Sequence, residues 1–406
     1  AGSPSKSFFY PSVGLSWVPS STWDLGNAFS YLKLRGSIAS VGLPFPRFLT
    51  TPTYEYDATG KIWKDKTHYP IGDLKPERTI TYEVGIDARL WKNISLSASW
   101  YSADTKNQTF DPALPPSSSY TTIYLQTGHV RNTGVELSLG YSNQWRDFGW
   151  SSNFTFSWNK NEIVDLASGA LNPVTGQPLN LSELDIKGLG KAKYILKQGG
   201  TLGDLYTTSD LKFNDNGYVE VDKAGNLLLT DEGEQIYLGS VFPSENLAWR
   251  NDFRYKGINL GLLFTGRIGG ICYSATQANM DLYGVSEVSA AARDAGGVLI
   301  NGREMVDAQK WYQAIGSQSG LPQYYTYSAT NFRLQELSLG YTLPRKWFRN
   351  KMVLTVSFVG RNLWMIYCKA PFDPEAVAST GLSYQGIDYF MMPSLRSLGF
   401  NVKFEF

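Results

Sequence analysis

The chain has 406 residues, and its 37 lysines and arginines balance 36 aspartates and glutamates, which gives a formal net charge of +1. No basic surplus therefore points to nucleic acid as a partner, and no acidic block is typical of a disordered tail. Aromatic residues make up 14% of the chain. No run of about 18 apolar residues occurs, which excludes a transmembrane helix. Such a composition is typical of a wall with one face in lipid and the other in water.

The dominant pattern is an alternation of apolar and polar residues in segments of about ten residues. In the last segment Leu398, Phe400, Val402, Phe404 and Phe406 share one face, and polar residues share the other. Successive side chains of a strand point to opposite faces, so each segment separates an apolar face from a wet one. The pattern predicts eleven strands, at 8–18, 28–40, 77–91, 93–102, 130–142, 147–160, 246–256, 258–268, 330–342, 351–363 and 394–406.

The predicted strand 330–342 has a break in its phase. Its apolar residues fall on opposite faces, Phe332 and Leu334 on one and Leu337, Leu339 and Tyr341 on the other. A β-bulge, which inserts one extra residue into a strand, would bring the two halves onto one face.

The connections between the predicted strands alternate between short and long. The long ones are 41–76, 103–129, 161–245, 269–329 and 364–393, whereas the others are short, as at Trp91-Lys92-Asn93. Short turns at one end and long loops at the other are the topology of an outer-membrane barrel with periplasmic turns and extracellular loops. The sequence therefore predicts an all-β fold, a transmembrane antiparallel β-barrel with long extracellular loops.

Aromatic residues gather at two levels of the predicted strands. Those near the short turns are Trp17, Trp91, Trp145, Trp347 and Phe348, and those towards the long loops are Trp100, Tyr101, Trp158 and Trp249. Two belts of rings at the membrane–water boundaries would produce this distribution. The alternative is that these rings are core aromatics of a water-soluble barrel.

Eleven strands do not close a bacterial barrel, since single-chain barrels have an even number of antiparallel strands. An open sheet exposes backbone N–H and C=O groups at two edges, and hydrocarbon offers them no partner. We therefore expect these strands to close against further strands outside this sequence.

Many stretches, taken in order, resemble the C-terminal region of SusC-like TonB-dependent transporters, also called the SusC/RagA family. They are "FFYPSVGLSWV", "LKLRGSIASVG", "GDLKPERTITYEVGID", "RNTGVELSLGY", "VDKAGNLLLTDEGEQIYLGS", "NDFRYKGINLGLLFTGRIGG", "FRLQELSLGYTLP", "VGRNLW", "FDPE" and "PSLRSLGFNVKFEF". The resemblance covers nearly the whole chain.

The resemblance implies a 22-stranded barrel, of which residues 1–406 would be the C-terminal part, without the plug, the TonB box and the N-terminal strands. It implies a multi-pass protein in the lipid of the outer membrane of a Gram-negative bacterium. It also implies a SusD-like surface lipoprotein as partner and energy supplied by the TonB complex through the plug. We expect active import of a large solute, an oligosaccharide or an oligopeptide. The alternatives are a passive porin-like or secretion-type barrel without a plug, and a soluble carbohydrate-binding β-protein.

The sequence offers no constellation of catalytic residues. It holds two histidines, His68 and His129, outside any metal-ligand spacing, and both are expected to be solvated. Cys272 and Cys368 lie in unrelated segments and are expected to be isolated thiols. We expect neither an enzyme nor a cofactor.

The stretch "NDNG" at 214–217 is similar to part of a calcium-binding loop. Lys212 and Lys223 stand where the first and last carboxylate ligands would be needed. A metal site is therefore not expected.

Aromatic residues among polar ones mark three of the long loops. Those assigned to solute binding are Tyr54, Tyr56, Trp63, Tyr69, Trp311, Tyr312, Tyr324, Tyr325 and Tyr384, and Tyr327 and Tyr389 lie near them. Flat rings beside hydrogen-bonding groups suit a sugar or peptide ligand. The alternative interpretation is that these rings pack the loops together or against a lid partner.

Two further motifs concern assembly and loop shape. Phe406, with Phe404 and Phe400 on the same face, resembles the C-terminal signal that the outer-membrane assembly machinery recognises in barrels. The residues Phe372, Asp373, Pro374 and Glu375 are expected to shape the last loop.

Overall fold

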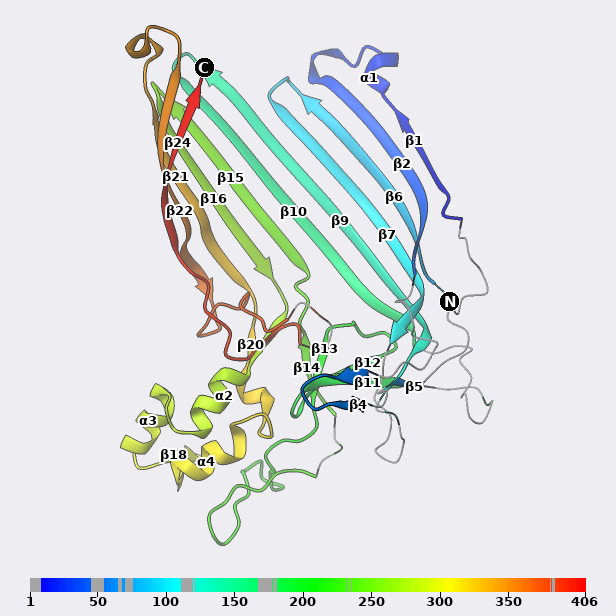
Figure 1. The fold of residues 1–406 in the computed structure, drawn as a ribbon, viewed down its shortest axis with the longest axis vertical. Helices are drawn as coiled ribbons and strands as arrows, with labels where there is room; N and C mark the ends of the chain where they lie inside the picture. The colour runs from blue at the N-terminus through cyan, green and yellow to red at the C-terminus, as the bar shows by residue number, and fades with distance from the viewer. Residues whose placement is uncertain are drawn as a thin grey trace.

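The computed structural model describes residues 9–44, 55–64, 68–69, 76–110, 120, 122–166, 177, 181–231, 233, 235–379, 381 and 384–406. Its main feature is one curved antiparallel sheet in which each strand pairs with the next strand of the same sheet along the chain (Figure 1). The shorter strands between them belong to the connections. The eleven strands are β1 (Ser12–Trp17), β2 (Phe29–Leu43), β6 (Glu77–Leu90), β7 (Ile94–Phe110), β9 (Leu125–Trp145), β10 (Phe148–Asp165), β15 (Glu245–Tyr255), β16 (Ile258–Ile268), β21 (Asn331–Thr342), β22 (Val353–Cys368) and β24 (Ser397–Glu405).

All eleven predicted strands are present in this sheet, but several are longer than predicted at the end that carries the long loops. Strand β7 continues to Phe110, and β9 already begins at Leu125. Residues on the apolar face of β7 become polar beyond Trp100, at Ser102, Asp104 and Lys106. The backbone hydrogen bonds between β7 and its neighbours thus continue beyond the last apolar residue. A strand predicted from the alternation of apolar and polar residues therefore ends too early.

The predicted bulge in strand β21 is confirmed. Leu263 pairs with Glu336 and Phe264 pairs with Leu334, so Gln335 is the extra residue. The bulge places Leu334 on the same face as Leu337, since side chains alternate on each side of it.

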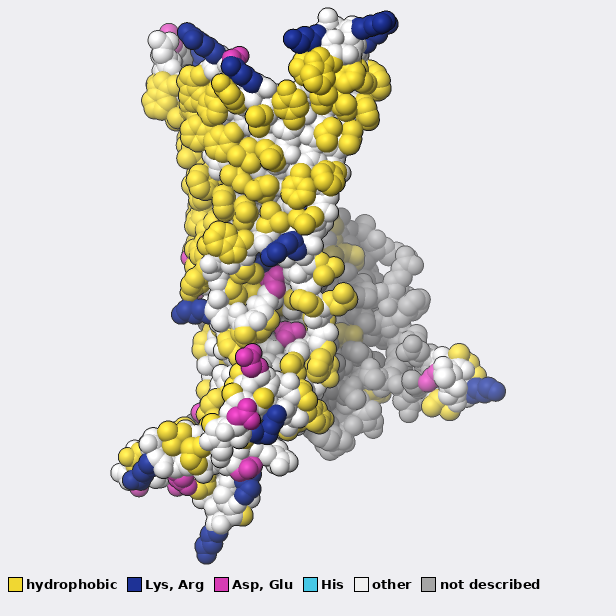
Figure 2. Space-filling model, turned by 90° about the vertical axis from the view of Figure 1, so that its left-hand side faces the viewer, with side chains coloured by type: hydrophobic (Ala, Val, Ile, Leu, Met, Phe, Trp, Pro, Cys, Tyr) yellow, Lys and Arg dark blue, Asp and Glu magenta, His cyan; other side chains and the backbone are white. Residues whose placement is uncertain are grey.

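The two faces of the sheet differ in chemistry. Register rows across neighbouring strands are apolar on the outer face, such as the row formed by Val84, Trp100, Val135 and Trp158. Figure 2 shows that apolar side chains cover the part of the outer face nearest the short turns, with charged side chains at the rim and towards the loops. An apolar outer face and a polar inner face are the arrangement of a barrel wall in lipid.

The short connections lie together at one end of the sheet, beside the C-terminus (Figure 1). The first contains α1 (Pro19–Thr22) and η1 (Gly26–Ala28), and another contains η3 (Arg345–Phe348). The turn at Lys256 and Gly257 has a positive φ at both residues, 46° and 90°. Two successive positive φ values are typical of a tight hairpin turn, whose twist matches that of the strands.

The long connections form a folded layer at the opposite end of the sheet. It contains β11 (Glu183–Leu189), β12 (Ala192–Lys197), β13 (Asp204–Thr207) and β14 (Ile236–Ser240) in one sheet, β17 (Ile271–Ser274), β20 (Thr326–Ser328) and β23 (Ile387–Asp388) in a second, and β3 (Glu55–Asp57), β4 (Ile62–Lys64), β5 (His68–Tyr69), β8 (Thr122–Ile123), β18 (Val298–Ile300) and β19 (Glu304–Val306) in pairs. Its helices are α2 (Ala275–Leu282), α3 (Glu287–Asp294), α4 (Ala308–Ile315) and η2 (Pro322–Tyr325). Among the described residues, no helix has both the length and the apolar character to cross a membrane.

The hydrophobic core of the protein lies in this loop layer and at the adjoining strand ends. Its largest fully buried side chains include Phe110, Tyr194, Leu205, Tyr273 and Leu321. By contrast, many aromatic and aliphatic side chains of the outer barrel face are exposed, and the terminal Phe406 is 98% exposed. The barrel wall therefore needs lipid to cover its apolar side, whereas the loop layer is stabilised by its own core.

We expect an arginine to be tolerated on the inner face of β9 and not on the outer face. Leu139→Arg places a charge in the middle of the apolar rows, which costs roughly 2–4 kcal/mol at the bilayer midplane. The neighbouring Ser138→Arg points to the wet side and should cost far less. Urea unfolding of the receptor in lipid vesicles measures both, and equal losses of unfolding free energy would contradict the assignment of faces.

Candidate functional site

The inner face of the sheet carries a network of charged side chains on β2 and β6. Arg35 bonds to Glu83, and its Nε lies 3.6 Å from Oδ2 of Asp87. Nζ of Lys33 lies 4.0 Å from the same oxygen of Asp87. Ser97 on β7 donates a hydrogen bond of 2.7 Å to Oδ1 of Asp87. Together these groups form a hydrogen-bonded charged patch on the inner wall.

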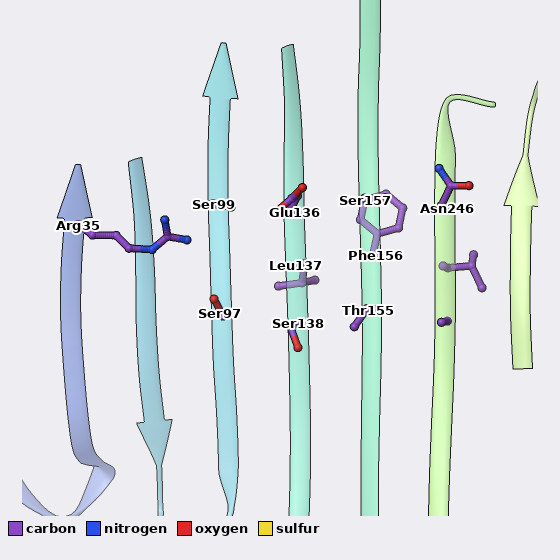
Figure 3. Close-up of a pocket in the computed structure, with 12 residues that line it drawn as sticks. Arg35, Ser97, Ser99, Glu136, Leu137, Ser138, Thr155, Phe156, Ser157 and Asn246 are labelled. Carbon is purple, nitrogen blue, oxygen red and sulfur yellow. The ribbon is translucent and has the colours of Figure 1, made fainter. Parts of the chain in front are cut away.

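A shallow hollow of about 370 Å³ lies beside this patch. It is lined by side chains from β2, β7, β9, β10 and β15, and Figure 3 shows Arg35 reaching across the neighbouring strand toward Ser97 and Ser99. Its other lining residues include the polar Glu136, Thr155 and Asn246 and the apolar Leu137, Phe156, Leu247 and Ala248. The lining thus combines hydroxyl, carboxylate and amide groups with apolar side chains.

A second charged network lies on the inner face at the other side of the sheet. Glu336 on β21 accepts a hydrogen bond of 3.1 Å from Nε of Arg361 on β22. Nη1 of Arg250 on β15 lies 3.6 Å from the same carboxylate, and Nε of Arg250 donates to Asp252 at 2.9 Å. Arg361 remains largely exposed to the interior of the barrel. The inner wall thus presents charged groups at two separate places.

The inner-wall networks were missed by the sequence analysis. Their members are charged residues at inward positions of different strands, and Ser37 pairs with Glu83 beside Arg35 on the same face. Recognising such pairs requires the strand register, which alternation within single strands does not supply. A search for opposite charges at matching distances from each short turn could have found them.

Two of the predicted solute-binding rings lie together on a projecting hairpin. Tyr56 on β3 pairs with Trp63 on β4, and their ring centroids are 5.1 Å apart. Tyr56 is 50% exposed and Trp63 is 67% exposed. Tyr54 and the side chain of Tyr69 lie outside the described residues. The exposed pair keeps the flat surfaces that a sugar or peptide ligand needs.

The predicted rings of the fourth loop are divided between surface and core. Tyr312 and Tyr325 are buried within the loop core, so they leave little surface for a solute. They pack the loops together, in line with the alternative interpretation. Trp311 and Tyr324 meet edge to face, with centroids 6.1 Å apart, and Tyr324 is partly exposed.

The rings near the last loop are nearer the surface. Tyr384 and Tyr389 are exposed, and Tyr389 packs edge to face on Phe390. The structure therefore brings only some of the predicted rings together, since they lie at several places on the loop layer.

The last loop is held to the barrel wall by a buried ion pair. Arg333 on β21, whose side chain is 3% exposed, donates two hydrogen bonds to Asp373, at 2.9 and 3.1 Å. It also donates to Asn331, and Ser394 donates to Asp373. A bidentate arginine–carboxylate pair fixes geometry as well as charge. Asp373 thus shapes the loop, as the sequence analysis expects.

The pKa of Asp373 reflects two opposing influences. Burial alone would raise it, but the hydrogen bonds from Arg333 and Ser394 lower the pKa below the usual value of an aspartate. A carboxylate with a lowered pKa stabilises the folded state above its unfolded pKa, and that contribution is lost as the pH falls through the folded pKa.

In the described part of the chain, no group of three or more histidine, cysteine or acidic side chains has metal-binding geometry. The side chain of Asn214 instead accepts hydrogen bonds from the N–H groups of Asn216 and Tyr218, which stabilises a turn. Cys272 and Cys368 are free thiols, as predicted.

One expectation about histidine is wrong. His129 is half-buried and paired, not freely solvated: 22% of its side chain is exposed, and its Nε2 lies 2.7 Å from Oδ1 of Asp104. Because β9 begins at Leu125, before the apolar pattern starts, His129 lies within the strand and not at its entrance. The side chain of His68 lies outside the described residues.

The sheet has eleven antiparallel strands, an apolar outer face, a charged inner face and a folded loop layer at one end. This combination defines an outer-membrane β-barrel protein. Residues 1–241 match the family model of the TonB dependent receptor-like β-barrel, and the chain belongs to this family. As a member of that family, it is a protein of the Gram-negative outer membrane.

Proteins named as TonB-dependent receptors are similar in sequence to most of this chain. TonB-dependent receptor P3 of Formosa agariphila is 24% identical over 98% of this chain and 42% of its own length. TonB-dependent receptor SusC of Bacteroides thetaiotaomicron is 20% identical over 82% of this chain and 32% of its own length. The chain therefore spans less than half the length of the relatives it matches.

Solved structures support the fold. The RagAB peptide importer in its closed-closed state superposes with a TM-score of 0.71 at 20% identity, over 97% of this chain and 43% of that chain. Its open-open state superposes with a TM-score of 0.69 at 19% identity. The predicted SusC-like resemblance and barrel fold are confirmed.

We expect acid to release the last loop through protonation of Asp373. Because its pKa is lowered, the ion pair with Arg333 should persist at pH 4 and weaken as the pH falls further. Pepsin cleavage between 369 and 396, normalised to a reference peptide at each pH, should therefore increase towards pH 2. Asp373→Asn should be cleaved readily at both pH values, whereas the exposed-turn control Asp147→Asn should behave like the wild type. A wild-type acid response in Asp373→Asn would contradict the assignment.

Proposed function

We propose that this chain is the C-terminal part of the barrel of a SusC-like importer, which takes up a large solute, an oligosaccharide or an oligopeptide, across the outer membrane. The observation that carries this proposal is the combination of a charged inner wall with a folded extracellular layer. A wall with ion pairs on its inner face suits a lumen that holds water or a polar domain. Membership of the TonB-dependent receptor family supports the same function.

The charged inner wall is proposed to be the seat of a plug domain from the part of the receptor outside this chain. Arg361 and the hollow beside Arg35 present donors and acceptors towards the lumen. In the proposed mechanism the TonB complex, driven by the proton gradient of the inner membrane, pulls on the plug. Each exposed ion pair between the plug and the wall would contribute little binding free energy. The plug could therefore exchange such contacts and rearrange without unfolding the wall.

The extracellular layer is proposed to form a vestibule, built from 41–76, 161–245 and 269–329, on which a SusD-like lipoprotein acts as a lid. Apolar side chains are exposed on and beside α2 and α3, namely Met280, Tyr283, Val285 and Val288, and on β18 and β19, namely Leu299 and Met305. Exposed apolar side chains gathered in one region are a feature of protein–protein contact sites. This helical part of the layer is the proposed contact for the lipoprotein.

The exposed rings of the vestibule are proposed to hold the solute. Tyr56 and Trp63 form the most accessible pair, and Tyr324 and Tyr384 lie on other loops. Rings stack on the apolar faces of sugar rings and of peptide side chains alike, so this surface fits both classes of solute. No catalytic role is proposed for any residue, and the chain is proposed to transport its solute without altering it.

Energised uptake separates an importer from a passive channel. Cells that carry the complete receptor should accumulate labelled oligosaccharides or oligopeptides, and accumulation should stop when an uncoupler removes the proton gradient. Uptake that continues unchanged in uncoupled cells would favour the porin-like or secretion-type barrel.

Removal of one vestibule ring should weaken solute capture. Trp63→Ala deletes an exposed stacking surface, and we expect the affinity for solute to fall roughly two- to tenfold, the usual range for one aromatic contact. Tyr325→Phe removes a hydroxyl from a buried ring and serves as the control that should keep the affinity. Binding is measured by calorimetry with the complete receptor, and an unchanged affinity in Trp63→Ala would exclude this ring from the binding surface.

A further inference from the structure

The outer face of four neighbouring strands changes from apolar to charged on the way to the loop layer. The row of Val84, Trp100, Val135 and Trp158 is the last apolar one that spans all four strands. Beyond it the outward positions of β7, β9 and β10 become polar at once, whereas those of β6 stay apolar up to Ile80 and become charged at Arg78. Those positions are Tyr82, Ser102, Thr133 and Lys160 in the first row, Ile80, Asp104, Arg131 and Glu162 in the second, and Arg78, Lys106, His129 and Asp165 in the third.

Most of the charges in these rows have partners. Nη2 of Arg131 lies 2.9 Å from Oδ1 of Asp104, which also bonds to His129. Nζ of Lys160 lies 2.8 Å from Oε2 of Glu162. These pairs neutralise one another and leave no excess charge.

Arg78 and Lys106 are different. They are directly opposite each other on β6 and β7, and both are exposed. Nε of Arg78 donates to Oγ of Ser40 at 2.8 Å, but among the described residues no carboxylate forms an ion pair with Arg78 or Lys106. Like charges directly opposite on a sheet are destabilising. An anion between the two side chains would remove that cost.

The level of this pair in the membrane indicates which anion is available. From Leu90 to Ile80 the outward residues of β6 are apolar. Ten residue steps of about 3.4 Å, tilted by roughly 45°, rise about 25 Å, which is the height of the apolar band of outer-membrane barrels. Arg78 is the next outward residue and therefore lies at the level of the outer-leaflet headgroups.

We propose that Arg78 and Lys106 bind a phosphate group of a phosphorylated glycolipid in the outer leaflet. The guanidinium of Arg78 offers a planar fork that matches phosphate oxygens, and Lys106 adds a point charge from the facing strand. The acyl chains of the same lipid would lie on the apolar rows below, beside Val84 and Trp100. This continuity with the lipid-facing rows favours a lipid over free phosphate.

The test measures lipid binding by the complete receptor in detergent. Native mass spectrometry compares bisphosphorylated lipid A with the same lipid after removal of both phosphates. We expect the wild type to prefer the phosphorylated lipid, and Arg78→Gln with Lys106→Gln to reduce that preference roughly tenfold or more, because both cations that attract the phosphate are removed. Millimolar inorganic phosphate should not displace the lipid.

A matched control removes the same charge at the other end of the barrel. Arg345→Gln with Lys346→Gln lies at the short-turn end and should keep the wild-type preference. Equal binding of both lipids by the wild type, or an unchanged preference in the Arg78 and Lys106 variant, would overturn the proposal. So would complete displacement by inorganic phosphate, which would indicate a site for the free ion.

Assembly of each variant is checked by its heat-dependent migration in gels. If the double variant does not assemble, Lys106→Gln is compared with Lys106→Arg, which keeps the charge and should keep the preference. Loss of the preference in both would overturn the proposal. The measurement uses neither solute nor a proton gradient, so its outcome is independent of whether the receptor imports.

Discussion

The structure depends on one constraint, that backbone groups in contact with hydrocarbon must find their hydrogen-bond partners within the protein. Each unpaired N–H or C=O there would cost several kcal/mol. The antiparallel ladder from β1 to β24 meets this requirement over most of the wall, and every strand pairs with its neighbour in sequence. Once the ladder is fixed, the alternation of side chains assigns one face to lipid and the other to the lumen.

The same constraint explains why the hydrophobic core is in the loops. The outer face of the wall is covered by lipid, and its inner face is polar, so the wall itself encloses no apolar interior. The connections at the far end have no lipid around them, and they bury Tyr194, Tyr273 and Leu321 among themselves. Arg333 and Asp373 join this layer to the wall through a bidentate contact. The surface proposed to capture solute is thereby fixed relative to the barrel.

The sequence predicted the strands well because lipid imposes a regular pattern on them. It predicted the ends at the loop side less well, because Asp104 and Lys106 interrupt the apolar face while the ladder of β7 continues. The bulge in β21 was predictable from the phase change at Gln335, since the apolar residues had to return to one face. These successes and errors follow from one source, the contact of side chains with hydrocarbon.

The candidate site was less predictable, because its chemistry depends on contacts between distant segments. Arg35 and Glu83 are 48 positions apart and meet only through strand register. Whether an aromatic ring of the loops is exposed also depends on packing. Tyr325 is buried in the core of the loop layer, whereas Trp63 is exposed on a hairpin. Composition marks both as aromatic residues among polar ones, and tertiary structure distinguishes them.

The length of strand β9 has a consequence for how the cell surface meets this protein. Its 21 residues extend about 70 Å along the strand, which at a tilt of roughly 45° is nearly twice the thickness of the apolar band. The wall therefore extends beyond the lipid on the side of the long loops. The proposed vestibule therefore lies beyond the lipid headgroups, and a solute would reach it without entering the headgroup layer.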